Sequence, residues 1–223
     1  MKASLRLALA MAFFALWIAA AFAQTKQPLT IITTSLESCV VDDPCALHVG
    51  AEGGTVPLQW RIVHGSLPPG LQLDPRYGII SGSAATAGDY EVVIEVSDAS
   101  LPPQKASRAF TVRALPVLAI DWKKPPGLNG TSVSGSVVVS NHGSAAIDLT
   151  FIVVAVNEVG KAFALGYQHF DLPPKTKDQE IPFESQLPGG RYTVRADAIG
   201  ELAARNRIYR AARDAGPFQV PVQ

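Results

Sequence analysis

Two cysteines, Cys39 and Cys45, are the residues whose type and spacing point most directly to chemistry. Five residues separate them, which excludes the C-x-x-C spacing of redox pairs. Two thiolates without further cysteine or histidine partners at zinc spacing are too few ligands for a zinc site. In an oxidising compartment such a pair forms a disulfide, and Asp43-Pro44 supplies the turn that a short loop needs. We therefore predict an intramolecular disulfide between Cys39 and Cys45 that closes a loop between the first two strands.

Other candidate catalytic groups lack the spacing that catalysis requires. None of the four histidines lies in an H-E-x-x-H or comparable motif: His48, His64, His142 and His169. No serine lies in a G-x-S-x-G turn. Glu91 and Glu95 share one strand face, but residues four apart on a strand are about 13 Å apart, beyond the separation of paired glycosidase carboxylates. We therefore predict no enzyme activity and no cofactor.

Calcium is the metal that we weigh, because it takes six to eight oxygen ligands from carboxylates and carbonyls. The candidate carboxylates are Asp42, Asp43, Asp121 and Asp98, and we expect Asp98 near the boundary between two domains. The chain has no D-x-D-x-D loop that would gather such ligands. We therefore predict no metal site.

Residues 191–213 are richer in arginine than any other stretch of the chain. The guanidinium fork binds carboxylates and stacks on aromatic rings, and Tyr209 lies among these arginines. We therefore predict a contact surface for an acidic protein or polymer partner, formed by Arg205, Arg207, Tyr209 and Arg210. The alternative is a solvated strand and loop whose charges keep a sheet edge from pairing with other chains.

The composition and the first residues restrict the class of protein. The 223 residues are 48% hydrophobic and 17% charged, with zero net charge, which is typical of a globular chain and gives no reason to expect nucleic-acid binding. Lys2 and Arg6 precede an apolar run that ends in Ala21-Phe22-Ala23, the pattern of a signal peptide cleaved before Gln24. We predict an exported protein, periplasmic or secreted, without a membrane span after cleavage.

Short alternating strands separated by glycine and proline turns position these residues and predict an all-β fold. The clearest strand is residues 90–97, where every second residue is apolar. Strands are also expected near residues 27–34, 45–51, 56–63, 71–73, 79–81 and 106–113. About seven such strands predict a β-sandwich in residues 24–114, with Trp60 as its large core side chain.

Residues 28–114 resemble the bacterial putative immunoglobulin domain, a cadherin-like sandwich of cell-surface and secreted proteins. The resemblance rests on Trp60, on Leu67-Pro68-Pro69-Gly70-Leu71 and on Gly78-Ile79-Ile80-Ser81-Gly82. It implies a spacer or an interaction module and no catalysis.

A second strand pattern occupies residues 115–223, with a turn at residues 124–127 and a nearly continuous apolar run at 147–156. The segment Leu187-Pro188-Gly189-Gly190-Arg191-Tyr192 looks like the tyrosine corner of fibronectin type III-like sandwiches, in which Tyr192 bonds back to upstream backbone. The order of motifs also resembles the bacterial cell-adhesion-related domain, another immunoglobulin-like fold. For residues 203–212 we expect an irregular approach to a final strand at 218–222.

These observations predict two tandem immunoglobulin-like β-sandwiches, residues 24–114 and 115–223, after a cleaved signal peptide of residues 1–23. We expect a non-enzymatic binding or spacer protein of the bacterial envelope or exterior that acts through protein–protein contacts. The alternative is a carbohydrate-binding accessory module, which requires a row of exposed aromatic side chains, to be supplied by Trp122, Tyr77, Tyr167 and Tyr209.

Overall fold

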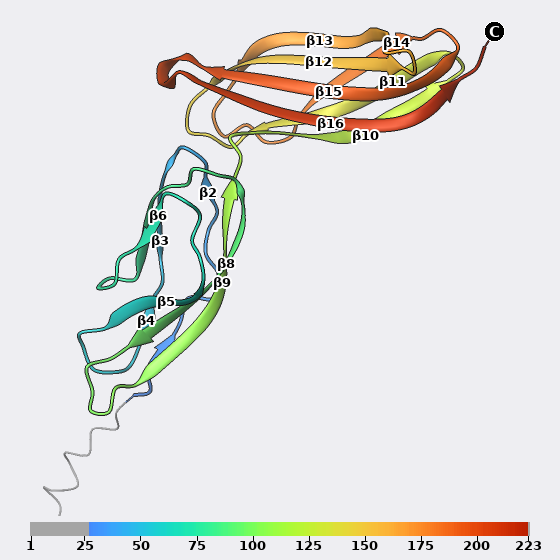
Figure 1. Cartoon of the computed structure of the whole chain (residues 1–223). Helices are drawn as coiled ribbons and strands as arrows, with labels where there is room; N and C mark the ends of the chain where they lie inside the picture. The colour runs from blue at the N-terminus through green and yellow to red at the C-terminus, as the bar shows by residue number, and fades with distance from the viewer. Residues whose placement is uncertain (1–26, 223) are drawn as a thin grey trace, which may run out of the picture.

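The computed structural model describes residues 27–222, which form two all-β units joined end to end (Figure 1). Each unit encloses its own hydrophobic core, the first drawn from residues 29–114 and the second from residues 117–220. We call the units the first and the second sandwich. The predicted signal peptide, residues 1–23, lies outside the described residues.

The first sandwich pairs a four-stranded sheet, β2-β9-β8-β5, with a three-stranded sheet, β3-β7-β6, and β1 pairs with β4. The strands are β1 (Thr30–Ile31), β2 (Cys39–Val40), β3 (Pro44–His48), β4 (Ala51–Glu52), β5 (Gln59–Gly65), β6 (Leu71–Leu73), β7 (Ile79–Ser83), β8 (Gly88–Ser97) and β9 (Lys105–Leu115).

The alternating pattern of the sequence fills the core of the first sandwich as predicted. Val92, Ile94 and Val96 of β8 are almost completely buried, and Trp60 of β5 is 5% exposed. Because successive strand side chains point to opposite faces, the intervening residues of β8 are directed to the other face. The short strand β2 was not predicted. It pairs in parallel with the end of β9 and so brings Cys39 next to Ala114.

The second sandwich pairs the sheet β10-β11-β14 with the sheet β13-β12-β15-β16. The strands are β10 (Leu118–Asn129), β11 (Ser132–Asn141), β12 (Ile147–Asn157), β13 (Ala162–Leu172), β14 (Gln179–Gln186), β15 (Gly190–Leu202) and β16 (Arg207–Val220), with the 3-10 turn η1 (Ala203–Arg205) before β16. The apolar run of residues 147–156 lies in β12, a central strand of its sheet. β12 pairs with β13 along one edge and with β15 along the other.

The tyrosine corner is confirmed. The hydroxyl of Tyr192 donates a 3.0 Å hydrogen bond to the carbonyl oxygen of Pro188. Tyr192 is 2% exposed, and its ring packs edge-on against Phe163 and stacks on Phe218. The corner therefore fixes the start of β15 through one polar bond and two aromatic contacts.

Two local predictions for the second sandwich are wrong. Residues 124–127 do not form a turn, because β10 continues through Pro125-Pro126 with register shifts between residues 122 and 127. Within residues 203–212, which were expected to be irregular, residues 207–212 instead belong to β16, after the 3-10 turn of residues 203–205. Asn206 takes the left-handed conformation, with φ of 49°, and reverses the chain so that β16 pairs with β15 over most of its length. Non-local pairing therefore decided the structure of a segment with mixed helix and strand propensities.

Candidate functional site at the junction of the two sandwiches

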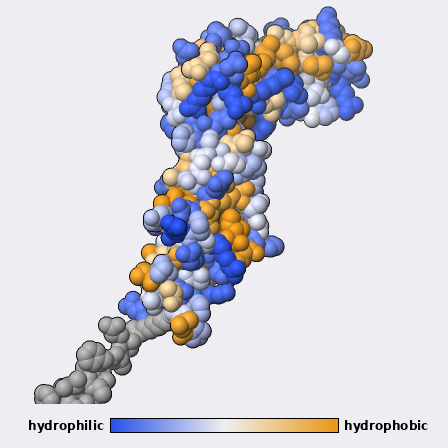
Figure 2. Space-filling model, turned by 60° about the vertical axis from the view of Figure 1, so that its left-hand side comes forward, coloured by the Kyte–Doolittle hydropathy of each residue, from blue (hydrophilic) through white to orange (hydrophobic). Residues whose placement is uncertain are grey.

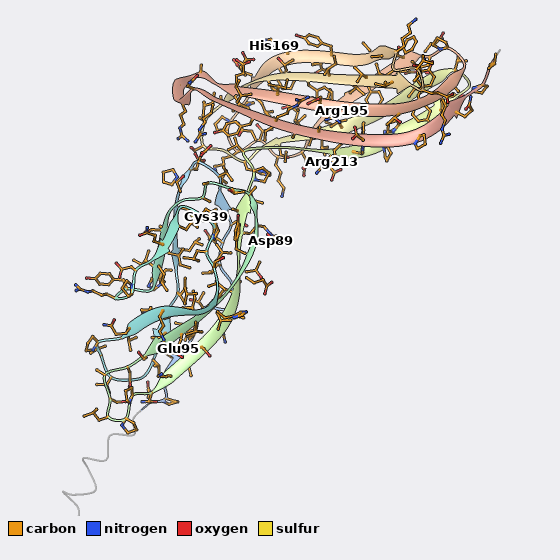
Figure 3. The ribbon with its side chains drawn as sticks, viewed as in Figure 1. Cys39, Asp89, Glu95, His169, Arg195 and Arg213 are labelled. Carbon is orange, nitrogen blue, oxygen red and sulfur yellow. A yellow bond between two sulfur atoms is a disulfide. The ribbon has the colours of Figure 1, made fainter. Side chains whose placement is uncertain are left out.

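The disulfide loop lies at the end of the first sandwich that meets the second (Figures 1 and 3). Cys39 and Cys45 are joined as predicted, with their Cα atoms 5.6 Å apart, and Cys39 is buried. Within the loop, Asp42 has a φ of 63°, in the left-handed region that Asp tolerates better than most residues. Its N–H donates to the carbonyl oxygen of Ala84, 3.0 Å away. The loop is therefore held in one conformation and directs two adjacent carboxylates, those of Asp42 and Asp43, toward the second sandwich.

Asp43 makes the central contact between the sandwiches. Its Oδ2 accepts the backbone N–H of Ser144 at 2.7 Å, and its Oδ1 accepts the Ser144 hydroxyl at 2.8 Å. A guanidinium nitrogen of Arg205 lies 3.1 Å from the same Oδ1. Burial alone raises the pKa of Asp43, but these hydrogen bonds outweigh it and hold the pKa below its ordinary value. The carboxylate is therefore charged and saturated by donors from the other sandwich.

Asp42 makes a second set of contacts beside the first. Nη2 of Arg207 lies 3.2 Å from one carboxylate oxygen, and the Tyr209 hydroxyl donates to the other at 3.2 Å. Arg205 also donates to the backbone carbonyl of Asp42, at 3.1 Å. Burial and the neighbouring carboxylate raise the pKa of Tyr209 above its ordinary value of 10, which is itself high enough to keep the hydroxyl a donor at neutral pH.

Apolar and backbone contacts accompany these charges. Val40, in the disulfide loop, packs against the core of the second sandwich. In the linker, the carbonyl oxygen of Pro116 lies 2.8 Å from Nδ1 of His142, and the backbone N–H of His142 donates to Val117 at 2.8 Å. The junction is thus fastened by the disulfide loop, by the start of β16 and by the linker itself.

The predicted contact surface divides between two places in the structure. Arg205, Arg207 and Tyr209 bind the first sandwich of their own chain. Arg210 instead pairs with Asp197 on the adjacent strand, at 2.9 Å and 2.5 Å, and its hydrogen bonds lower the pKa of that carboxyl. These arginines thus have carboxylate partners within the chain, and binding to a separate acidic partner stays a prediction.

Asp42 and Asp43 were expected only as candidate calcium ligands, and neither they nor Ser144 were predicted to contact these side chains. The adjacent acids in the disulfide loop have the charge opposite to that of the arginine stretch, and this was the available signal. The separation of 162 residues between Asp43 and Arg205 left no local pattern to connect them.

The expectation that Asp98 lies near the domain boundary is wrong. Asp98 follows β8, which runs from Asp89 near the junction to the opposite end of the first sandwich (Figure 3). Its carboxylate accepts hydrogen bonds from the backbone N–H groups of Thr55, Ser100 and Gln104 at 2.7–3.2 Å. The Ser100 hydroxyl adds a bond of 2.6 Å. These donors occupy the oxygens that a calcium ion would need, so Asp98 serves as a structural anchor for surrounding loops.

Several other polar side chains form surface pairs. Glu95 binds Arg61 at 2.7 Å, and Glu91 accepts a bond from Thr111. His169 lies 3.3 Å from Asp148 at the exposed edge of β13, labelled in Figure 3. Within residues 27–222, no group of three or more histidine, cysteine or acidic side chains is placed to hold a metal ion. The same part of the chain contains no helix long and apolar enough to cross a membrane.

Two of the four aromatic residues considered for carbohydrate binding are committed to internal contacts. Trp122 packs edge-on against Phe183, and its indole N–H donates to the carbonyl oxygen of Asp214 at 3.3 Å. Tyr209 bonds to Asp42. Tyr77 and Tyr167 are exposed but belong to different sandwiches. These four side chains therefore do not form one continuous row of exposed aromatic rings.

Residues 19–114, which include the first sandwich, match the family model described as the putative Ig domain. No curated protein matches the chain. Among solved structures, a putative alpha-galactosidase from Bacteroides fragilis is 26% identical, with a TM-score of 0.35, and the match covers 40% of this chain and 18% of the other. Mouse cadherin-23 domains EC22-24 are 15% identical, with 83% and 65% covered and a TM-score of 0.37. Drosophila N-cadherin EC1-4 is 11% identical, with 84% and 49% covered and a TM-score of 0.34.

Proposed function

We propose that this chain, whose residues 19–114 match the putative Ig domain model, is an exported, non-enzymatic interaction protein. Its junction holds two sandwiches at a fixed angle, so that binding surfaces on each are presented at a fixed spacing. The immunoglobulin-like fold supports a protein-interaction module. The disulfide and this fold fit an extracellular or periplasmic location. Export by cleavage before Gln24 and a role in adhesion or scaffolding are part of the proposal.

The observation that carries this proposal is that both carboxylate oxygens of Asp43 accept hydrogen bonds from the second sandwich, which supports a fixed angle between the sandwiches. Relative domain motion is the ordinary expectation for two domains joined by a short linker and a small interface. Here Asp43, a buried residue, bonds through its carboxylate to Ser144 and Arg205 of the other sandwich. Rotation about the linker would break these bonds and transfer the carboxylate to water, with a net loss of roughly 1.5–3 kcal/mol for each hydrogen bond to the charged group. The two sandwiches therefore behave as one bent unit, with their long axes at a steep angle to each other (Figure 1).

Small-angle X-ray scattering of residues 24–223 tests the fixed angle. We expect the wild-type curve to fit a single bent shape. The triple variant Asp43→Ala/Arg205→Ala/Arg207→Ala should give a broader distribution of shapes and a larger maximum dimension. The control is Arg191→Ala/Arg213→Ala, which also removes arginines from the second sandwich but away from the junction. Identical curves for wild type and the triple variant, with both sandwiches folded, would show that the junction does not fix the angle.

A further inference from the structure

A hollow on the first sandwich lies beside Trp60, away from the junction. It has a volume of about 720 Å³, within the range of ligand-binding clefts, and is formed by the start of β5, the end of β3 and the turn between β6 and β7. Ile32, Val56 and Tyr77 line it and are 53%, 79% and 65% exposed. Figure 2 shows hydrophobic surface gathered on the first sandwich. Exposed apolar groups that share one hollow indicate a binding surface better than the same groups scattered singly.

The turn that carries Tyr77 is rigid. The side chain of Asp74 accepts the N–H groups of Arg76 and Tyr77 at 2.8 Å and 3.2 Å. The N–H of Trp60 donates to the carbonyl oxygen of Pro75 at 2.8 Å, which ties the turn to β5. Gly78 completes it with a φ of 67°. The turn thus holds an exposed tyrosine and an exposed arginine without using either in the core, and such preorganised Tyr and Arg side chains are common hot spots of protein interfaces.

The basic side chains around the hollow favour an acidic partner. Arg76 and His48 line it together with apolar side chains, and no Asp or Glu does. Among residues 27–222, Arg76 has no carboxylate within ion-pair distance. A partner that fills the hollow with an apolar side chain and places a carboxylate next to it would satisfy both features.

The geometry points to the Tyr77 hollow as a docking site for a segment of another protein that carries an apolar side chain adjacent to Asp or Glu. This inference rests on the proposed function as an interaction protein and names one of its binding surfaces. Residues 1–26 of this chain do not have the required chemistry, because they are apolar and basic and contain no Asp or Glu.

Selection from a library of displayed random peptides tests the inference. We expect residues 24–223 to enrich peptides that share an apolar residue next to Asp or Glu. The enriched peptide is then titrated against the Trp122→Phe variant, in which Trp60 is the single tryptophan of residues 24–223. Binding should shift the emission of Trp60. If Trp122→Phe does not fold, the indole N–H resonance of Trp60 in the wild-type protein gives the same information by NMR.

Variants of the hollow identify where the peptide binds. Tyr77→Ser and Arg76→Glu should each weaken binding at least tenfold, which corresponds to about 1.4 kcal/mol. Tyr167→Ser removes an equally exposed tyrosine from the second sandwich and should change nothing. The inference is overturned if no peptide is enriched, if the enriched peptides lack an acid, or if both hollow variants bind as wild type does. Binding of an oligosaccharide or of a peptide of residues 1–23 in place of the acidic peptide would also overturn it. The scattering test of the junction involves neither Arg76 nor Tyr77, so the two proposals can fail separately.

Discussion

Oδ1 of Asp43 lies 3.1 Å from a guanidinium nitrogen of Arg205, and this pair joins the disulfide loop of the first sandwich to the 3-10 turn η1, just before β16, in the second. The aspartate side chain is 10% exposed and the arginine side chain 41%. The carboxylate therefore depends on its protein donors more than the guanidinium depends on the carboxylate. Loss of charge on Asp43 should weaken the junction more than loss of Arg205 alone, since Ser144 would still hold the carboxylate.

Acid should open the junction. The hydrogen bonds from Ser144 and Arg205 hold the pKa of Asp43 below its ordinary value of 3.8. A carboxyl with a depressed pKa in the joined state contributes its stabilisation fully above 3.8, and this contribution is lost as the pH falls through the depressed pKa. We expect the maximum dimension from X-ray scattering to stay constant above pH 5 and to rise below about pH 4. Circular dichroism at each pH shows whether the sandwiches stay folded.

Asp43→Asn provides the control for this pH dependence, because its amide cannot titrate. We expect this variant to be open already at neutral pH, with about 1–3 kcal/mol lost from the junction through imperfectly paired donors. A compact variant whose dimensions follow those of the wild type at every pH would show that another group controls the junction.

Removal of the disulfide should destabilise the first sandwich. Closing the short loop between Cys39 and Cys45 restricts the unfolded chain, which corresponds to roughly 2 kcal/mol. We expect Cys39→Ala/Cys45→Ala to lower the melting temperature of the first sandwich. The variant should also broaden the distribution of shapes, because the same loop carries Asp42 and Asp43. Calorimetry and scattering measure the two effects.

Intact mass spectrometry of protein exported by its native host provides the complementary check. We expect a mature chain that begins at Gln24 and gains two hydrogen atoms on reduction. Two free thiols before reduction would contradict the disulfide.

The first sandwich should not tolerate a side chain at Gly78. A Cβ there would lie 2.7 Å from Cε2 of Trp60 and 2.7 Å from the carbonyl oxygen of Val49, and the φ of 67° disfavours any L side chain. We expect Gly78→Ala to cost roughly 1–3 kcal/mol through overpacking in addition to about 1 kcal/mol of backbone strain. Gly130→Ala is the matched control, since Gly130 has a φ of 63° but no neighbour within 4 Å. Equal losses of stability in the two variants, measured by urea unfolding, would mean that Trp60 moves aside without cost.

The sequence predicted most of what depends on local periodicity. The alternation of β8 and the turns that flank it were sufficient to place Val92, Ile94 and Val96 in a core, because a strand with one buried face requires a period of two. Tyr192 was predicted from a short motif whose hydrogen bond spans only four residues. These features need no knowledge of how distant segments meet.

Features that depend on docking were not predictable in this way. Residues 207–212 have no decisive local propensity, and they form part of a strand because β15 offers an edge after the turn at Asn206. The arginines of this segment were recognised as binding residues, but their partner was sought outside the chain. The sequence does not encode the angle between the sandwiches in any local pattern, so the contact of Arg205 with Asp43 could not be inferred from either segment alone.

Asp98 should make the first sandwich sensitive to acid. Burial alone raises the pKa of this carboxyl, but the hydrogen bonds from Ser100, Gln104 and Thr55 outweigh it and hold the pKa far below its ordinary value of 3.8. The stabilisation is therefore fully present above pH 3.8 and declines as the pH falls further, through the depressed pKa. We expect Asp98→Asn to lower the melting temperature of the first sandwich at pH 7 and to flatten its dependence on pH below 4. An unchanged melting temperature would show that the loops around residues 55 and 100–104 are held by other contacts.

The hydroxyl of Tyr192 should stabilise the second sandwich independently of the junction. Tyr192→Phe removes the 3.0 Å bond to Pro188 but keeps the ring against Phe163 and Phe218. We expect the free energy of unfolding of the second sandwich to fall by about 0.5–1.5 kcal/mol, the usual net contribution of one neutral hydrogen bond. Its melting temperature should fall by a few degrees. Tyr167→Phe, at a 64% exposed position, is the control and should have no effect. If both variants melt as wild type does, the tyrosine corner contributes only its ring, and the start of β15 is held by aromatic packing alone.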